Sequence, residues 1–183
     1  MRAAHLKANV AQLEMLGTER KARVLAAIDP AVIDAIHQAT RLAWLPVDYD
    51  VAVSRAVVSV CGYDGAMQWS RAATEDTLRS PLLRNVVRPA LRLFRSTPAG
   101  FLRLLPRMLS TIYRDCGTFE VHPAGPHSVR IEATNLPHVI HDDETYLHGL
   151  GETFAMACEL VGVSPSATTE RRSDGHVTWV LTW

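Results

Sequence analysis

The spacing of apolar residues changes once along this chain of 183 residues, near Gly117, and that change constrains the fold more than any other feature. Before it, apolar side chains recur every three or four residues, which is typical of amphipathic helices. After it, short runs alternate between apolar and polar residues, which is typical of strands with one buried face. The sequence therefore predicts a helical first part and a second part built on a sheet.

The first part predicts about seven helices, separated by glycine or by a capping residue followed by proline. The capping pairs are Asp29-Pro30, Ser80-Pro81 and Thr97-Pro98. Expected helices cover residues 3–16, 18–28, a short stretch from 30, 48–62, 64–78, 81–95 and 97–115. Pro106 lies inside the last of them and predicts a kink, because proline removes a backbone donor.

The second part predicts strands at 118–121, 128–133, 167–172 and 176–183, with one helix after the acidic residues 142–144. Residues 135–141 are expected to form a loop. Because the links within each strand pair are short, each pair is antiparallel. The predicted fold class is α+β, with an N-terminal helical layer followed by a β-β-α-β-β four-stranded antiparallel sheet. Residues 1–183 are expected to form a single domain, helical over 1–115 and ββαββ over 116–183.

Charge and cysteine content limit the environment and the partners. Lysine plus arginine equals aspartate plus glutamate, so the net charge of zero disfavours nucleic acid and anionic membranes as partners. Cys61, Cys116 and Cys158 are widely spaced and odd in number, which favours reduced thiols in a cytoplasmic protein. No apolar run is long enough to predict a membrane span or a signal peptide.

Several local patterns together resemble a known family. The helix that contains Pro106 and ends at Gly117 runs into the hairpin that starts Thr118-Phe119-Glu120-Val121, and the next helix carries Gly149, Gly151 and Glu152. The segments Trp44-Leu45-Pro46 and Asp64-Gly65, and the C-terminal pair Thr182-Trp183, complete the set. This succession resembles a myxobacterial paralogue family of about this length.

That family is similar in topology to haem–nitric-oxide-binding domains, to 4-vinyl-reductase-type domains and to TRAPP subunits. The resemblance implies a ligand pocket between helices and sheet, since those proteins hold haem, hydrocarbon-like ligands or acyl chains there. Haem-binding members grip the propionates with a Tyr-x-Ser-x-Arg motif. The corresponding stretch here, Ile131 to Pro137, has none of these three residues in that spacing. Because this motif is missing, the pocket that the resemblance implies is expected to hold no haem.

The helix expected over 97–115 carries the widest apolar stripe and is the predicted pocket wall. The ligand-binding residues predicted for this pocket are Phe101, Leu105, Met108, Tyr113 and Phe154. The alternative is that the same stripe is ordinary core, because core-facing helices show the same periodicity.

An arginine-rich stretch is the most unusual local feature. Eight arginines and no acidic residue lie between Thr77 and Arg114. Arg84, Arg88, Arg92 and Arg95 share one helical face, and their mutual repulsion would be relieved by carboxylates or phosphates. The two interpretations are a docking face for an acidic protein partner, and pairing with acids of the same chain such as those at 142–144.

Three histidines and three acids crowd residues 138–148, including His138, His141 and His148. A haem or metal sensor that uses these histidines is one hypothesis, since imidazole and carboxylate are metal ligands. The spacing matches no known ligand motif, and a solvated helix start is the alternative. No metal site is therefore predicted.

Catalytic motifs are lacking: the chain has no GxSxG, no P-loop and no GxGxxG sequence. The sequence therefore predicts a non-catalytic sensor or adaptor module for signalling, with no catalytic residues and no cofactor. Its expected partner is an apolar small molecule bound in the pocket. The alternatives are a haem or metal sensor and a protein-docking adaptor, and a homodimer is compatible with each of them.

Overall fold

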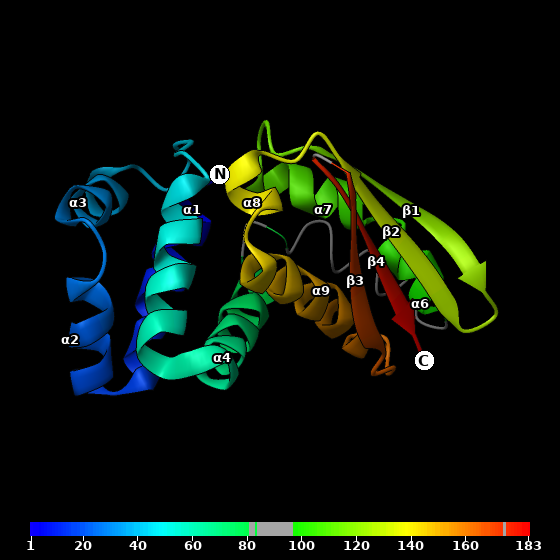
Figure 1. The fold of residues 1–183 in the computed structure, drawn as a ribbon, viewed down its shortest axis with the longest axis horizontal. Coiled ribbons are helices and arrows are strands. Elements are labelled where there is room, and N and C mark those ends of the chain that lie inside the picture. Colours follow the sequence, from blue (N-terminus) through cyan, green and yellow to red (C-terminus); the bar gives the residue numbers. More distant parts are fainter. Residues whose placement is uncertain (81–82, 84–96, 174) are drawn as a thin grey trace. The chain divides into compact units, whose positions relative to one another are not determined.

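The computed structural model describes residues 1–80, 83, 97–173 and 175–183 (Figure 1). Its contacts group these residues into two compact units. Unit 1 comprises Met1–Thr77 with Ile112–Arg114, and unit 2 comprises Leu78–Thr111 with Asp115–Trp183. The expected helix over 81–95 lies outside the described residues, apart from Leu83. The single domain expected over 1–183 stays a prediction.

Unit 1 is helical, as the sequence predicts. It contains α1 (Ala3–Ala11), the 3-10 helix η1 (Gln12–Leu16), α2 (Thr18–Ala26), α3 (Pro30–Gln38) and most of α4 (Asp48–Arg79). The Asp29 carboxylate accepts a hydrogen bond from the Ala31 amide, so the predicted cap of α3 is confirmed. Gly62 has φ 71° and breaks α4 into two helical segments, which confirms the predicted helix end there.

The core of unit 1 is apolar and draws on every one of these helices. The apolar side chains without solvent exposure are Ala3, Leu6, Leu13, Val24, Ile36, Val53 and Val57. The first residues join this core through an isolated antiparallel bridge between Arg2 and Trp44. The Arg2 guanidinium lies 3.8 Å from the centre of the Trp44 ring, in cation–π geometry.

Over residues 97–115 the prediction of a single kinked helix is wrong. Two short helices, α6 (Pro98–Leu102) and α7 (Leu105–Ile112), replace the single kinked helix. Pro106 is the second residue of α7, in the first turn, where its missing N–H has no helical acceptor to lose. Proline therefore starts a helix here and does not bend one.

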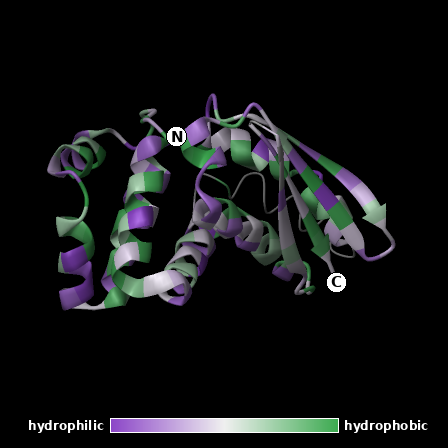
Figure 2. Ribbon diagram, in the orientation of Figure 1, coloured by the Kyte–Doolittle hydropathy of each residue, from purple (hydrophilic) through white to green (hydrophobic). Residues whose placement is uncertain are grey.

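Unit 2 contains a four-stranded antiparallel sheet, which confirms the predicted α+β class. Its strands are β1 (Thr118–Gly125), β2 (Ser128–Thr134), β3 (Ser166–Ser173) and β4 (His176–Thr182). Their order is β1-β2-β4-β3, so β1 and β3 are the edges. Figure 2 shows hydrophobic and hydrophilic segments alternating along the strands, as expected for a sheet with one buried face.

Helix α9 (Glu144–Glu159) lies between the two strand pairs in sequence and packs against β3. The Asp143 side chain caps it by accepting from the Tyr146 amide. The preceding stretch corrects the prediction of a loop over 135–141, because residues His138–His141 form the short helix α8. Pro137 directly precedes it, and its fixed φ suits the start of a helix turn.

The two central strands, β2 and β4, are buried on one face of the sheet, called the inner face below. Its side chains without solvent exposure are Val129, Ile131, Ala133, Val177, Trp179 and Leu181. The register places Ile131 opposite Trp179. Because successive side chains in a strand point to opposite faces, Glu132 and Thr178 belong to the other face, called the outer face below.

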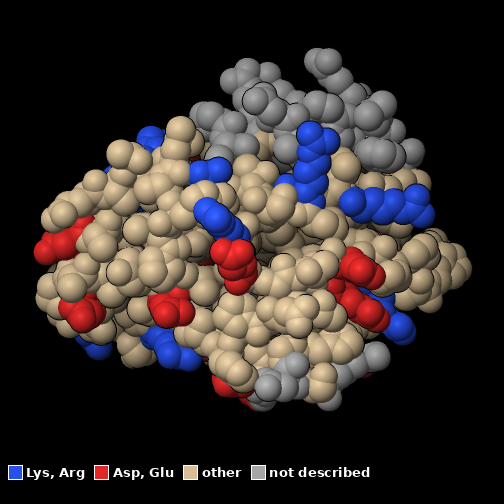
Figure 3. Space-filling view, turned by 90° about the horizontal axis from the view of Figure 1, so that it is seen from above, with Lys and Arg blue, Asp and Glu red and all other residues tan. Residues whose placement is uncertain are grey.

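Charged side chains of both signs are interspersed on the face of the molecule drawn in Figure 3. This agrees with the net charge of zero. Among the described residues, no helix combines the length and the apolar character that a membrane crossing needs.

Candidate functional site

The predicted pocket residues are buried, and four of the five lie in unit 2. Phe101 of α6, Leu105 and Met108 of α7, and Phe154 of α9 are each at most 4 % exposed. Helix α6 packs against α9, so Phe101 and Phe154 belong to neighbouring helices. Tyr113 belongs to unit 1, where its ring centre lies 6.4 Å from that of His5. The candidate ligand site is therefore restricted to the other four residues.

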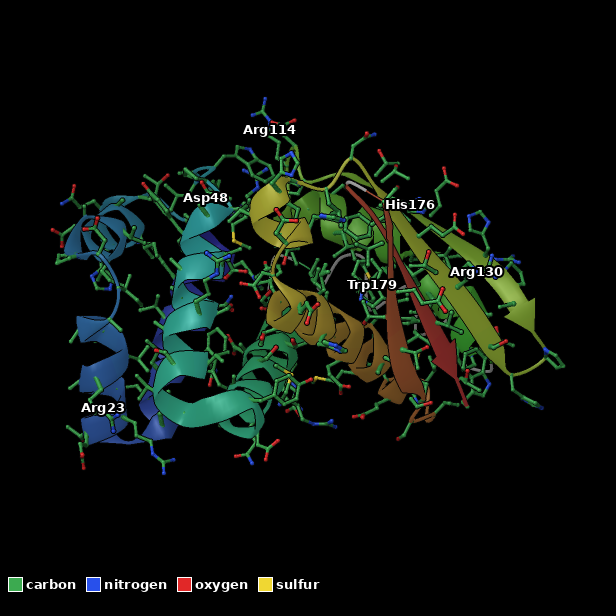
Figure 4. The ribbon with its side chains drawn as sticks, viewed as in Figure 1. Arg23, Asp48, Arg114, Arg130, His176 and Trp179 are labelled. Atoms are coloured by element: carbon green, nitrogen blue, oxygen red, sulfur yellow. The ribbon has the colours of Figure 1, made fainter. Side chains whose placement is uncertain are left out.

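An aromatic cluster fixes α9 on the inner face of the sheet. The rings of Phe154 and Trp179 meet edge to face with centres 5.2 Å apart, and Phe119 of β1 stacks on Trp179 at 6.4 Å. The Trp179 indole N–H donates to the Leu147 carbonyl at 2.9 Å. Trp179 is marked in Figure 4, between the strands and α9.

The histidine and acid cluster predicted at 138–148 forms a structural contact. His141 is 6 % exposed, with Nδ1 2.9 Å from an Asp142 carboxylate oxygen and Nε2 2.7 Å from the Ser173 carbonyl oxygen. Both partners are acceptors, so both ring nitrogens face a hydrogen-bond acceptor and neither is directed to an open position. His141 thereby ties the α8–α9 junction to the end of β3.

The side chains of this cluster are not grouped as a set of metal ligands. His138 Nδ1 lies 3.9 Å from the Asp142 carboxylate, and the His138 side chain is 76 % exposed. Over the ranges that the structure describes, no group of three or more histidine, cysteine or acidic side chains is arranged to hold a metal ion.

A buried polar cluster in unit 1 was not predicted from the sequence. Asn9 is 5 % exposed and Asp50 is 3 % exposed, and the Asn9 side-chain amide donates to the Asp50 carboxylate at 2.7 Å. The same amide nitrogen lies 3.2 Å from His5 Nε2, and His5 Nδ1 lies 3.0 Å from the Thr77 hydroxyl. Trp69 donates its indole N–H to the Asn9 carbonyl.

These contacts define the protonation of His5. Because the Asn9 amide nitrogen is a donor, His5 Nε2 accepts and the proton lies on Nδ1. Burial lowers the pKa of His5 below its ordinary value; the Asp50 carboxylate partly offsets this, and the N-terminal ammonium adds to the lowering. His5 is therefore held neutral within the cluster.

Unit 1 is expected to lose stability below pH about 6.5. There His5 of the unfolded chain begins to take up a proton, whereas His5 of the folded chain has a lower pKa and stays neutral. The free energy of unfolding should fall by up to about 1.4 kcal/mol per pH unit from this residue alone. Urea unfolding at several pH values measures it. His5→Gln should flatten the fall, whereas the control His37→Gln, at an exposed position of α3, should keep it. An unchanged slope in His5→Gln would contradict the assignment.

The cysteines are free thiols. Cys116 and Cys158 are buried, and Cys61 is half-buried. Burial, with a smaller contribution from Glu159, raises the pKa of the Cys158 thiol to about 12. Cys158 therefore stays a thiol at neutral pH and packs as an apolar side chain.

The predicted docking face of Arg84, Arg88, Arg92 and Arg95 lies outside the described residues. Docking of an acidic partner to these arginines stays a prediction.

Comparison with known proteins identifies the fold. No family model matches this chain, and no curated protein sequence matches it. Solved structures of H-NOX proteins match over its full length. An Fe(II) unliganded H-NOX protein from K. algicida shares 12% identity at a TM-score of 0.68, with 100% of this chain and 96% of that chain covered.

An oxygen-binding H-NOX domain related to soluble guanylate cyclases matches with a TM-score of 0.55 and 12% identity, over 100% of this chain and 94% of that chain. At these identities the similarity establishes the fold alone. It agrees with the predicted topology in the order of helices and in the four-stranded antiparallel sheet. The chain has the α+β fold of H-NOX domains.

Proposed function

We propose that this chain is a non-catalytic sensor module that binds a small apolar molecule in unit 2. The observation that carries the proposal is the full-length match to H-NOX proteins, one of which is described as binding oxygen. The buried side chains of Phe101, Leu105, Met108 and Phe154, called the apolar layer below, are of the kind that lines small-molecule sites.

Haem is the second candidate, and the fold comparisons favour it, because the matching structures are H-NOX proteins. The side chains do not fit it. All eight histidines lie among the described residues, and His5 and His141 have partners at both ring nitrogens. The exposed histidines are His37, His122, His127, His138 and His148.

His176 is the remaining histidine, and its Nε2 atom is buried without a hydrogen-bond partner. It alternates with Val177 and therefore lies on the outer face of the sheet, away from α9. The stretch from Ile131 to Pro137 also offers no propionate grip: Ile131 and Ala133 are buried on the inner face, and the Leu136 amide is bonded to the Gly175 carbonyl. These residues favour a ligand other than histidine-coordinated haem.

Filling the apolar layer is expected to block the ligand. Met108→Trp should weaken the binding of a fluorescent long-chain fatty acid by about tenfold or more, because the added ring occupies the volume that the probe needs. Fluorescence titration measures the affinity. The matched control is Met15→Trp, at a side chain that is 47% exposed in unit 1. Circular dichroism verifies that both variants are folded. Equal affinity in both variants, or no saturable binding to the unchanged protein, would contradict the proposal.

A further inference from the structure

A row of side chains crosses the outer face of the sheet at one level. The register pairs Glu120 with Glu132, Glu132 with Thr178, and Thr178 with Glu170, so the row contains one residue from each strand. Three of the four are glutamates. We call these four residues the acidic row. Nothing in the proposed ligand site involves it, because α9 and the aromatic cluster contact the inner face.

The carboxylates of the acidic row face solvent. The Glu120 side chain is 65% exposed, the Glu132 side chain is 27% exposed, and Glu170 is exposed. Like charges placed directly opposite each other in a sheet repel, so pairing Glu120 with Glu132 disfavours the folded state unless cations are near. The row therefore attracts positive charge.

The chain places a histidine and an arginine against two of these carboxylates from the next level of the sheet. His122 Nε2 lies 3.2 Å from a Glu120 oxygen, and Arg130 Nη1 lies 3.7 Å from a Glu132 oxygen. Glu170 also has an electrostatic or hydrogen-bonding partner within the chain. Ion pairs on an exposed surface contribute little and exchange readily, so these contacts leave the carboxylates able to bind a cation.

Thr178 marks the centre of the row. It has no solvent exposure, and its hydroxyl oxygen is buried without a hydrogen-bond partner. A valine of the same shape would fill this place without a buried polar atom, so the unpartnered hydroxyl needs an explanation. Its neighbours on both sides are glutamates, and an arginine or lysine side chain carries only donors. A cation between Glu132 and Glu170 would donate to both carboxylates, and to the Thr178 oxygen once the side chains that cover it move aside.

We propose that the acidic row is a docking surface for a basic protein segment, with one arginine over Thr178 and a second at Glu120. Neighbouring strands lie about 4.8 Å apart, so Thr178 is two spacings, about 10 Å, from Glu120. A helix rises about 1.5 Å per residue. Arginines at positions i and i+7 of a helix lie on one face and match this interval.

The test uses a helical peptide with arginines at i and i+7, and a second peptide of the same composition with its two arginines on opposite sides of the helix. Calorimetric titration at low and physiological salt should show one peptide bound per chain, about tenfold more tightly for the first peptide than for the second. Glu132→Gln combined with Glu170→Gln should reduce the affinity of the first peptide by about tenfold.

Two further variants make the outcome specific. Thr178→Val should weaken the first peptide several-fold without lowering the melting temperature, because it removes only the unpartnered oxygen. Glu152→Gln, at an exposed position of α9, should leave the affinity unchanged. Equal binding of both peptides, or equal losses in the Glu152 and Glu132/Glu170 variants, would show general charge attraction and overturn the proposal. Self-association of the chain that the Glu132/Glu170 variant abolishes would also overturn it, since a second copy would then be the occupant.

The fatty-acid titration of the same variants separates this proposal from the proposed function. Loss of peptide binding with unchanged fatty-acid affinity assigns the acidic row to a partner and not to the ligand.

Discussion

Trp179→Ala is expected to lower the free energy of unfolding of unit 2 by about 3–5 kcal/mol, the usual range for a fully buried tryptophan. Trp179 has no solvent exposure, meets Phe154 edge to face and donates to the Leu147 carbonyl. Its removal leaves a cavity between β4 and α9. Guanidinium unfolding followed by circular dichroism measures the loss.

Trp183→Ala is the matched control, because Trp183 follows β4 and is only half-buried. The same substitution at position 183 should lower the free energy of unfolding by clearly less. A loss below about 1 kcal/mol in Trp179→Ala would mean that α9 does not rest on the inner face as described.

Gly117→Ala is expected to destabilise unit 2 by about 2–4 kcal/mol, for two additive reasons. Gly117 has φ 88°, in the left-handed region, and a Cβ atom there would lie 2.6 Å from the Thr134 carbonyl oxygen. That oxygen belongs to the backbone of β2 and cannot move without shifting the strand.

Gly162→Ala separates the two reasons. Gly162 has φ 82°, and a Cβ atom added to it would meet no other atom within 4 Å. The Gly162→Ala variant should therefore lose only about 1–2 kcal/mol, the cost of holding an alanine in the left-handed backbone conformation. Equal losses at the two glycines in urea unfolding would contradict the close approach of residue 117 to β2.

Local signals in the sequence predicted the fold well. Asp29-Pro30 starts α3, Gly62 and Gly117 interrupt the chain with positive φ, and alternation defines β2 and β4. Each of these signals acts through the residue's own backbone or through its immediate neighbours. The error at Pro106 is of another kind, because proline suits both the first turn of a helix and a kink. The helix break at Arg103 and Leu104, which places Pro106 in the first turn of a new helix, decides between a helix start and a kink.

The polar contacts could not be predicted, because their partners are distant in sequence. Asn9 meets Asp50 across 41 residues, and His141 meets the Ser173 carbonyl across 32. Spacing within residues 138–148 left a metal sensor as one hypothesis, whereas the adjacent Asp142 and the distant Ser173 carbonyl face the two ring nitrogens of His141. Helical periodicity correctly predicted that Phe101, Leu105, Met108 and Phe154 are buried, and their role in ligand binding stays a prediction.

The acidic row could not be predicted from the sequence either. Glu120, Glu132 and Glu170 are scattered through the sequence, and only the register of four strands puts them on one line with Thr178. Strand alternation alone predicts that each points away from the core, but it does not predict which residues become neighbours.

Native mass spectrometry of the chain purified from the organism that encodes it tests the central claim most directly. The account predicts the polypeptide with one small apolar organic molecule per chain, lost on denaturation, and no stoichiometric iron. The same measurement on Met108→Trp should show the polypeptide without that molecule. A stoichiometric haem complex that persists in Met108→Trp and disappears in His176→Ala would contradict the account, because the chain would then hold haem through a histidine on the outer face of the sheet.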